Sequence, residues 1–147
     1  MKRKVLFLSA SGVHGAMAEA LLNRIGAENF EAVSAGSEGG KLDSFTVEIM
    51  RETNIDLSHV TLRSIEEFKG NEFDYVIRIG NCPEFNELKF RRAEVLQWTF
   101  ENPDMKSTDP VRLLRTLRTI RDQITQRLHL LVLVLVPKPA ALAAATK

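Results

Sequence analysis

The sequence has one cysteine and no excess of charge of either sign. A single cysteine, Cys82, excludes a disulfide within the chain and is typical of a reducing compartment, so we expect a cytoplasmic location. Twenty Lys and Arg residues stand against 19 Asp and Glu residues, which gives a net charge of +1. This balance provides no general attraction to nucleic acid or to anionic lipid, so we predict that the chain does not bind nucleic acid.

Long apolar runs and metal-binding patterns are also absent from the sequence. No apolar run reaches the roughly 18 residues that a membrane span requires, so we predict no span. His59 and His129 lack the spacing of metal ligands to any other residue, and neither a zinc motif nor a nucleotide P-loop motif occurs. We therefore expect no metal and no cofactor. A chain of 147 residues is long enough to bury a core of its own.

Segments of strand length alternate with segments of helix length along the chain. Val5–Leu8 is continuously apolar, which is typical of a central parallel strand covered on both faces. Ser64 and Glu67 form the capping-box pattern of a short helix. We predict strands over residues 5–8, 30–34, 74–79 and 93–96, and helices over 16–25, 44–53, 64–68 and from 109 to about 128. The alternation predicts right-handed crossovers and a three-layer α/β sandwich with a parallel sheet.

The last predicted helix is long and amphipathic, and Pro110 occupies a tolerated position in its first turn. Its apolar stripe consists of Leu113, Leu117, Ile120, Ile124 and Leu128. Four arginines lie off that stripe, namely Arg112, Arg115, Arg118 and Arg121. We interpret them as a solvated face that could also dock an acidic partner.

An apolar segment, Leu130–Val136, follows this helix. Its alternating Leu and Val residues either extend the helix or form an added strand, and either would expose an apolar patch without a partner. The alternatives are packing on the chain's own core, a homodimer contact through 128–136, or contact with a membrane surface. We treat 1–128 as one domain and 129–147 as a C-terminal extension, with a frayed or helical Ala-rich end over 140–147.

The most informative segment joins the first strand to the first helix. Phosphate-binding α/β proteins place their chemistry at such a junction, because free backbone N–H groups and the helix dipole favour an anion there. We therefore predict a site for a phosphate-like oxyanion, to which a protonated His14 would add positive charge. The candidate anion-binding residues are Ser9, Ser11, Gly12, Val13, His14 and Gly15.

A series of short motifs runs in the same order as in a known family. They are Val5-Leu6-Phe7-Leu8, Met17-Ala18-Glu19, Ser34-Ala35-Gly36, Asn54-Ile55-Asp56-Leu57-Ser58, Phe73-Asp74-Tyr75-Val76-Ile77, Trp98-Thr99-Phe100-Glu101-Asn102-Pro103 and Arg118-Thr119-Ile120-Arg121-Asp122-Gln123-Ile124. From Val5 to about Leu128 the chain resembles the low-molecular-weight protein tyrosine phosphatase family, and most closely its thioredoxin-coupled arsenate reductase branch. The resemblance implies a phosphotyrosine protein phosphatase I-like fold with four parallel strands in the order 2-1-3-4.

Three residues that the family uses for catalysis are missing from the matching positions. Ser9 stands where the family's nucleophilic Cys follows the first strand, and a serine hydroxyl is not an anionic nucleophile unless a base activates it. No Arg occurs between Arg3 and Arg24 to bind the oxyanion, and the loop is about one residue shorter than the family's. Asn102 replaces the general-acid Asp that precedes Pro, and an amide cannot donate a proton to a leaving group.

Two further side chains are candidates for chemistry. Cys82 resembles a redox cysteine of the arsenate reductases, which carry two cysteines in this region; because only one is present, we favour a structural thiol over a regulatory one. Ser9 and His14 could form a Ser–His pair, but no third member is evident. We favour Ser9 as a small residue at the end of the strand and His14 as a loop residue.

Three hypotheses of function follow from these residues. We favour a catalytically inactive member of the family that acts by binding an anion or a protein partner. The first alternative is a phosphatase or arsenate reductase with an altered active site that uses Ser9 or Cys82. The second alternative is a structural homodimer. Whether the chain is an enzyme stays open at this point, because the family is enzymatic but its Cys, Arg and Asp are missing.

Overall fold

The computed structural model describes residues 2–100 and 109–135 of the chain. In chain order the elements are β1 (Arg3–Leu8), α1 (Val13–Ile25), β2 (Phe30–Ala35), β3 (Gly40–Lys41), α2 (Ser44–Arg51), β4 (Thr61–Leu62), the 3₁₀ helix η1 (Ile65–Phe68), β5 (Tyr75–Ile79), the 3₁₀ helix η2 (Pro83–Phe85), β6 (Glu94–Trp98) and α3 (Pro110–Leu135). Asn102 and the Ala-rich end over 140–147 lie outside the described residues.

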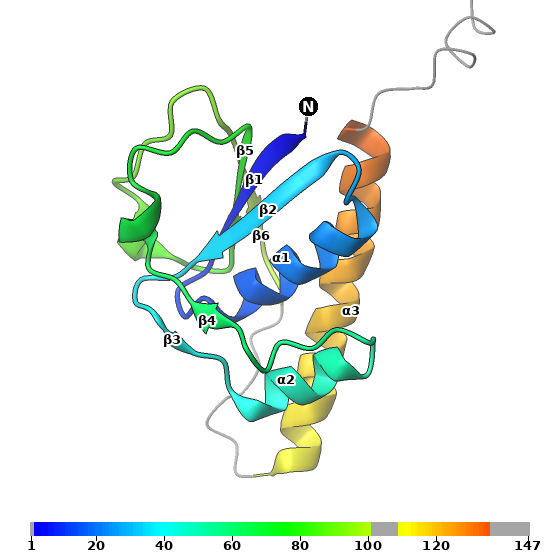
Figure 1. Cartoon of the computed structure of the whole chain (residues 1–147). Helices are drawn as coiled ribbons and strands as arrows, with labels where there is room; N and C mark the ends of the chain where they lie inside the picture. The colour runs from blue at the N-terminus through cyan, green and yellow to red at the C-terminus, as the bar shows by residue number, and fades with distance from the viewer. Residues whose placement is uncertain (1, 101–108, 136–147) are drawn as a thin grey trace, which may run out of the picture.

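The four longer strands form one parallel sheet in the order β2-β1-β5-β6 (Figure 1). Numbered within this sheet, the order is 2-1-3-4, so the expected topology is confirmed. β1 is central: Leu6 lies opposite Val33 of β2 on one side and Val76 of β5 on the other. β3 and β4 form a separate antiparallel ladder.

Both faces of the sheet are covered, because successive side chains of β1 point to opposite sides. Val5 and Phe7 pack in a cluster with residues of α1, α2 and α3. Leu6 and Leu8 pack on the other face with residues of η1 and η2. All four side chains are completely buried, which explains the continuous apolar run of this strand. The third layer consists of short 3₁₀ helices and loops rather than long helices.

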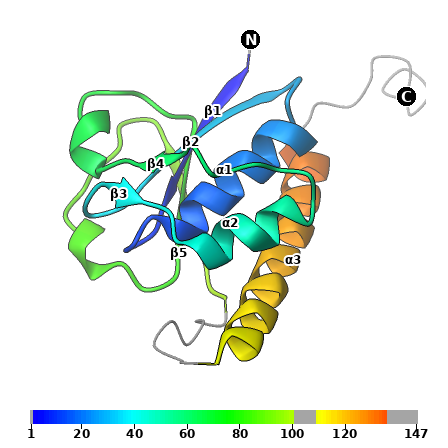
Figure 2. The same cartoon turned by 60° about the horizontal axis from the view of Figure 1, so that its bottom comes forward.

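The helical layer is organised around α3, against which both α1 and α2 lie (Figure 2). The predicted apolar stripe of α3 is confirmed, since none of its five residues is more than 4% exposed. Asp43 caps α2 by accepting a hydrogen bond from the Thr46 amide at 3.0 Å. The predicted capping box of Ser64 and Glu67 is present at the start of η1.

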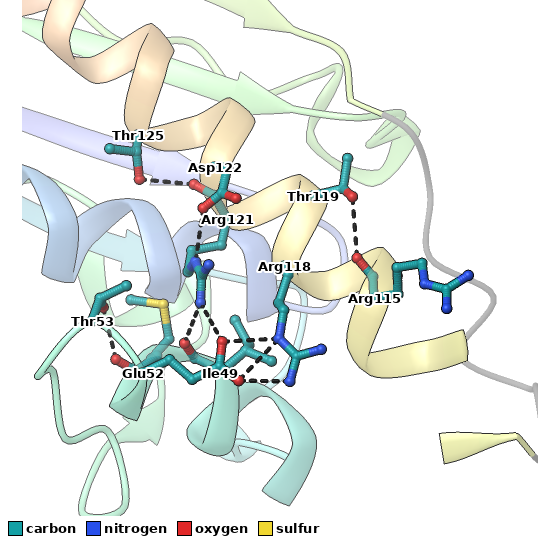
Figure 3. Close-up of polar contacts among 10 residues, drawn as sticks. Ile49, Glu52, Thr53, Arg115, Arg118, Thr119, Arg121, Asp122 and Thr125 are labelled. Atoms are coloured by element: carbon teal, nitrogen blue, oxygen red, sulfur yellow. Dashed lines mark hydrogen bonds and ion pairs between the residues drawn. The ribbon is translucent and has the colours of Figure 1, made fainter. Parts of the chain in front are cut away.

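Two of the arginines that lie off the apolar stripe of α3 join it to α2. Arg118 and Arg121 both bind the carboxylate of Glu52, which follows α2 (Figure 3). The side chain of Arg121 is only 11% exposed. The interpretation of this residue as part of a solvated face is therefore wrong, because its partner comes from a helix far away in the sequence.

The start of α1 differs from the prediction. The helix begins at Val13 rather than Ala16, so His14 and Gly15 lie in its first turn, and the interpretation of His14 as a loop residue is wrong. Gly12 is the N-cap residue, with a left-handed φ of 85° and no side-chain hydrogen bond to the helix. Since no Ser, Thr, Asp or Asn caps this end, the sequence contains no conventional signal for its position.

The apolar tail extends α3 instead of forming an added strand. α3 runs from Pro110 to Leu135 without a break. Leu128 and Leu131 are buried, and Arg3 Nη1 donates a hydrogen bond to the carbonyl of Leu135 at 2.7 Å. This part of the tail therefore packs on the chain's own core. The separation of 129–147 as an extension stays a prediction.

Three side chains near the end of α3 remain at the surface: Leu130, Leu133 and Val134 are 55%, 76% and 78% exposed. They lie off the buried stripe of the helix. None of the helices within residues 2–100 and 109–135 combines the length and the apolar composition that crossing a membrane requires.

Candidate functional site

The loop between β1 and α1 packs directly on the backbone that follows β2. Gly12 adopts a φ of 85°, a conformation that glycine reaches without steric cost. Gly36 faces it so closely that a Cβ atom on Gly36 would lie 2.9 Å from the nitrogen of Gly12 and 3.0 Å from the carbonyl carbon of Ser11. The Ser37 amide also donates to the carbonyl of Ala10 at 3.1 Å. These contacts close one side of the loop.

Several amides of this loop already have acceptors inside it. The Gly12 amide donates to the carbonyl of Ser9 at 3.2 Å, and the Val13 amide donates to Ser11 Oγ at 3.3 Å. The Gly15 amide donates to Ser9 Oγ at 3.1 Å. An oxyanion at this helix N-terminus needs amides as donors, so these three amides would have to give up their present acceptors before they could bind one.

Ser9 occupies a tight, buried position at the end of β1. The residue is 3% exposed, and its hydroxyl is held by the Gly15 amide. A Cβ atom on Gly15 would come within 3.3 Å of both Ser9 Oγ and Ser34 Cβ. A larger residue at position 15 would therefore displace the side chains of Ser9 and Ser34. Within the described part of the chain, no hydrogen bond joins Ser9 to His14. A Ser–His pair is therefore not formed in this conformation.

Burial lowers the pKa of His14 below its ordinary value. Desolvation is the cause, because moving the imidazolium out of water disfavours its charged form. The neutral imidazole is therefore favoured at pH 7. The sequence analysis predicted that a protonated His14 would add positive charge beside the oxyanion. The burial of the imidazole opposes that protonation.

Sequence reasoning missed one titratable group next to this loop, Glu19. It lies one helical turn after Gly15, and its Oε1 accepts a hydrogen bond from Ser34 Oγ at 3.2 Å. Burial raises the pKa of Glu19, while the charge of Arg63 and the Ser34 hydroxyl oppose that rise. The sequence signal that could have identified Glu19 is its i, i+4 spacing from Gly15. This spacing puts the carboxyl on the helix face that contacts the loop.

The structure brings Cys82 close to the end of β1. Its Sγ lies 3.4 Å from the carbonyl oxygens of Ile79 and Gly80 and 3.9 Å from that of Leu8. The thiol is 1% exposed, and burial raises its pKa, opposed by the charge of Arg78. A buried, protonated thiol is a poor nucleophile, which agrees with the structural role that the sequence favoured.

The described residues contain no cluster of three or more His, Cys, Asp or Glu side chains placed to hold a metal ion. Asn102, the predicted counterpart of the general acid, cannot be located relative to Ser9 because it lies outside the described residues. The residues that the structure does bring together at the carboxyl ends of β1 and β5 are Ser9, Gly15 and Cys82 with their neighbours.

The sheet and this junction define the class of the protein: an α/β protein whose first strand leads through a glycine turn into a helix. Its family follows from sequence. The chain belongs to the family described as low molecular weight phosphotyrosine protein phosphatase, whose sequence profile matches residues 4–143. The fold and the family predicted from the motifs are therefore confirmed.

Several relatives of the chain are arsenate reductases. The glutaredoxin arsenate reductase of Synechocystis sp. is 27% identical over 133 residues, which cover 90% of this chain and 97% of that protein. A solved structure described as an arsenate reductase in the phosphate binding state has a TM-score of 0.74 and 28% identity, over 90% of this chain and 97% of that one. The low molecular weight protein tyrosine phosphatase from T. tengcongensis has a TM-score of 0.71 at 20% identity, over 91% and 100% of the two chains, and shows similarity of fold alone.

Proposed function

We propose that this chain acts by binding, without the cysteine-dependent reaction of its family. The observation that carries the proposal is the position of Ser9. This residue stands where the resemblance places the nucleophilic cysteine, and its hydroxyl accepts the Gly15 amide hydrogen in a buried site. A hydroxyl needs a base to become a nucleophile, and the site offers Ser9 no such contact within the described residues.

The rest of the loop supports the same proposal. No arginine lies between Arg3 and Arg24, so the loop lacks a planar fork that could hold two oxygens of an oxyanion. The amides of Gly12, Val13 and Gly15 are bonded inside the loop. The binding partner is a phosphate-like oxyanion or a protein.

Steady-state turnover tests this proposal. We would assay arsenate reduction with glutathione and glutaredoxin, since one relative is a glutaredoxin arsenate reductase, and phosphatase activity with p-nitrophenyl phosphate. The Synechocystis relative is the positive control. We expect this chain to be indistinguishable from Ser9→Ala and Cys82→Ser in both assays. Turnover that disappears in either variant would instead establish an enzyme with an altered site that uses that residue.

A second candidate function is that of a homodimer, favoured by the exposed side chains of Leu130, Leu133 and Val134. Leu130 lines a pocket of about 350 Å³ together with Phe100, Gln126 and Arg127. Two copies could pack their α3 helices antiparallel about a two-fold axis that passes near Leu130. In that arrangement the side chains of Leu133 and Val134 of one copy would meet this pocket of the other copy. Light scattering at ten-micromolar concentration tests this dimer. A molar mass equal to one chain would exclude it. A molar mass equal to two chains, which falls to that of one chain in Leu133→Gln, would support it.

A further inference from the structure

Arg78, at the end of β5, carries a half-buried charge with no opposite charge beside it. Its Nη2 donates to the carbonyl of Cys82 at 2.6 Å and to Asn86 Oδ1 at 2.8 Å, and both acceptors are neutral. None of the ion pairs formed among the described residues includes Arg78. Charges taken partly out of water are stabilised by an opposite charge, so an anion beside this guanidinium would be favoured.

Apart from the interaction of the guanidinium with the Cys82 thiol, the remaining nitrogens of Arg78 make no hydrogen bond within the described residues. Nε is buried and has no hydrogen-bond partner. Nη1 makes no hydrogen bond within the described residues and, unlike Nε, is not buried from solvent. An unsatisfied buried nitrogen on a half-buried cation calls for a specific explanation, and the binding of an anion is one of the standard ones. Nη1 is the donor that a ligand can reach from solvent.

Arg78 lines a pocket of about 400 Å³ with Gly80, Asn81, Cys82, Asn86, Gln97 and Thr99. This lining contains one cation, no carboxylate and several neutral hydrogen-bonding side chains. Asn86 turns its oxygen toward Arg78, which leaves its NH₂ group as a donor. Gln97 lies directly across from Arg78 in the register of β5 and β6, and its Nε2 fixes the carbonyl of Gly80 at 2.8 Å. A guanidinium among amide and hydroxyl donors suits a ligand with several oxygens better than a single halide ion.

The position of the pocket in the sheet supports this interpretation. From β1 the chain moves to β2 on one side, whereas β5 is followed by β6 on the other side, so the strand order reverses between β1 and β5. Open α/β sheets bind ligands outside the carboxyl ends of the strands at such a point. The pocket lies at the carboxyl ends of β5 and β6, and Cys82 connects it to the end of β1 through its 3.9 Å contact with the Leu8 carbonyl.

We infer that the pocket around Arg78 binds a small oxyanion of the phosphate or arsenate type, with Arg78 as its charged donor and Asn81, Asn86 and Thr99 as neutral donors. The inference deepens the proposed binding function and rests on it. It locates the anion after β5, away from the loop between β1 and α1, where the amides of Gly12, Val13 and Gly15 already have acceptors. It needs no residue of that loop to change its contacts.

The test is a titration of the ¹⁵N-labelled full chain with phosphate, and separately with arsenate, at fixed ionic strength. We expect saturable NMR shifts of the side-chain amides of Asn81, Asn86 and Gln97 that share one binding constant. Arg78→Gln should weaken binding by at least about tenfold, because a charge-assisted hydrogen bond is lost. Arg78→Lys keeps the charge without the planar fork and should give an intermediate loss.

The matched control is Arg115→Gln, since Arg115 is an exposed arginine on α3 whose guanidinium points away from the Glu52 contacts (Figure 3). It should bind as the unchanged chain does. If Arg78→Gln fails to fold, Thr99→Val tests the same pocket without removing the Arg78 hydrogen bonds. Shifts confined to residues 9–16, equal affinity in Arg78→Gln, or no saturable shift with either anion would overturn the inference. Turnover in the assays above would contradict the proposed function instead, so the two failures are distinguishable.

Discussion

At the residue scale, His14 gives a pH-dependent contribution to stability. Its pKa is lowered from 6.5 by burial, so between the two values the unfolded chain binds more protons than the folded chain. Stability therefore falls as the pH decreases through about 6.5. We expect the unchanged chain to lose more stability between about pH 7.5 and pH 5.5 than His14→Gln does, measured by urea unfolding. His129→Gln, at an exposed position of α3, should keep the original slope. Equal slopes for the unchanged chain and His14→Gln would contradict the burial of this ring.

Gly36 sets how closely the loop after β1 approaches the backbone after β2. In Gly36→Ala the new Cβ would lie 2.9 Å from the Gly12 nitrogen, and backbone cannot move away as a flexible side chain can. Overpacking of this kind costs about 1–3 kcal/mol, which urea unfolding would detect. Ala27→Ser, at an exposed position, is the control and should change stability by less than about 0.5 kcal/mol. If Gly36→Ala is as stable as the unchanged chain, the two segments are not in close contact.

At the element scale, Glu52 joins α2 to α3. Arg118 donates to both of its carboxylate oxygens at 2.7 to 2.9 Å, and Arg121 donates to Glu52 Oε1 at 2.8 Å and to the carbonyl of Ile49 at 2.7 Å (Figure 3). These hydrogen bonds lower the pKa of Glu52 to about 2. The carboxylate therefore stabilises the fold above the unfolded value of 4.5, and this contribution is lost as the pH falls toward 2.

Glu52→Gln should consequently lower the thermal unfolding midpoint at pH 7. The difference from the unchanged chain should shrink as the pH approaches 2 and as salt is added, because salt screens exposed charges. Glu28→Gln removes an exposed carboxylate that pairs with no cation among the described residues, and it should have little effect. A midpoint that is the same in Glu52→Gln at pH 7 would mean that the contact adds no stability.

The two sides of α3 provide a matched pair of substitutions. Leu117 is completely buried against the sheet, whereas Leu133 is 76% exposed. Leu117→Ala should destabilise the chain by about 2–5 kcal/mol in urea unfolding, because it leaves a cavity in the core. Leu133→Ala should change the stability of the monomer by less than about 0.5 kcal/mol. Similar losses in both variants would place Leu133 in a buried contact.

Patterns within one element predicted that element well. The apolar stripe of α3 and the continuous apolar run of β1 predicted the buried residues correctly. The spacing of apolar residues within one helix or strand is enough to indicate which of its faces are buried. The start of α1 was missed because Gly12 caps it without a side-chain hydrogen bond. The role of Arg121 was missed because Glu52 is 69 residues away in the sequence, and no pattern on α3 reveals it.

At the scale of the whole molecule, the strand order was available from the motifs that resemble the family, and it is confirmed. The candidate site was less predictable. The sequence identified the loop from Ser9 to Gly15, but it could not show that the amides of Gly12, Val13 and Gly15 donate to acceptors inside the loop. The pairing of β5 with β6 places Arg78 beside Gln97, and such proximity across strands has no signature in either segment alone.

The central claim is that this chain keeps the fold of its family without running the family's cysteine reaction. The most direct measurement is the turnover of Ser9→Cys beside the unchanged chain, with arsenate and with p-nitrophenyl phosphate. The account predicts no turnover for either protein, because a thiol at position 9 would still lack an arginine in the loop to hold the oxyanion. Turnover by the unchanged chain would contradict the claim, and turnover by Ser9→Cys alone would show that the loop can still form the family's site.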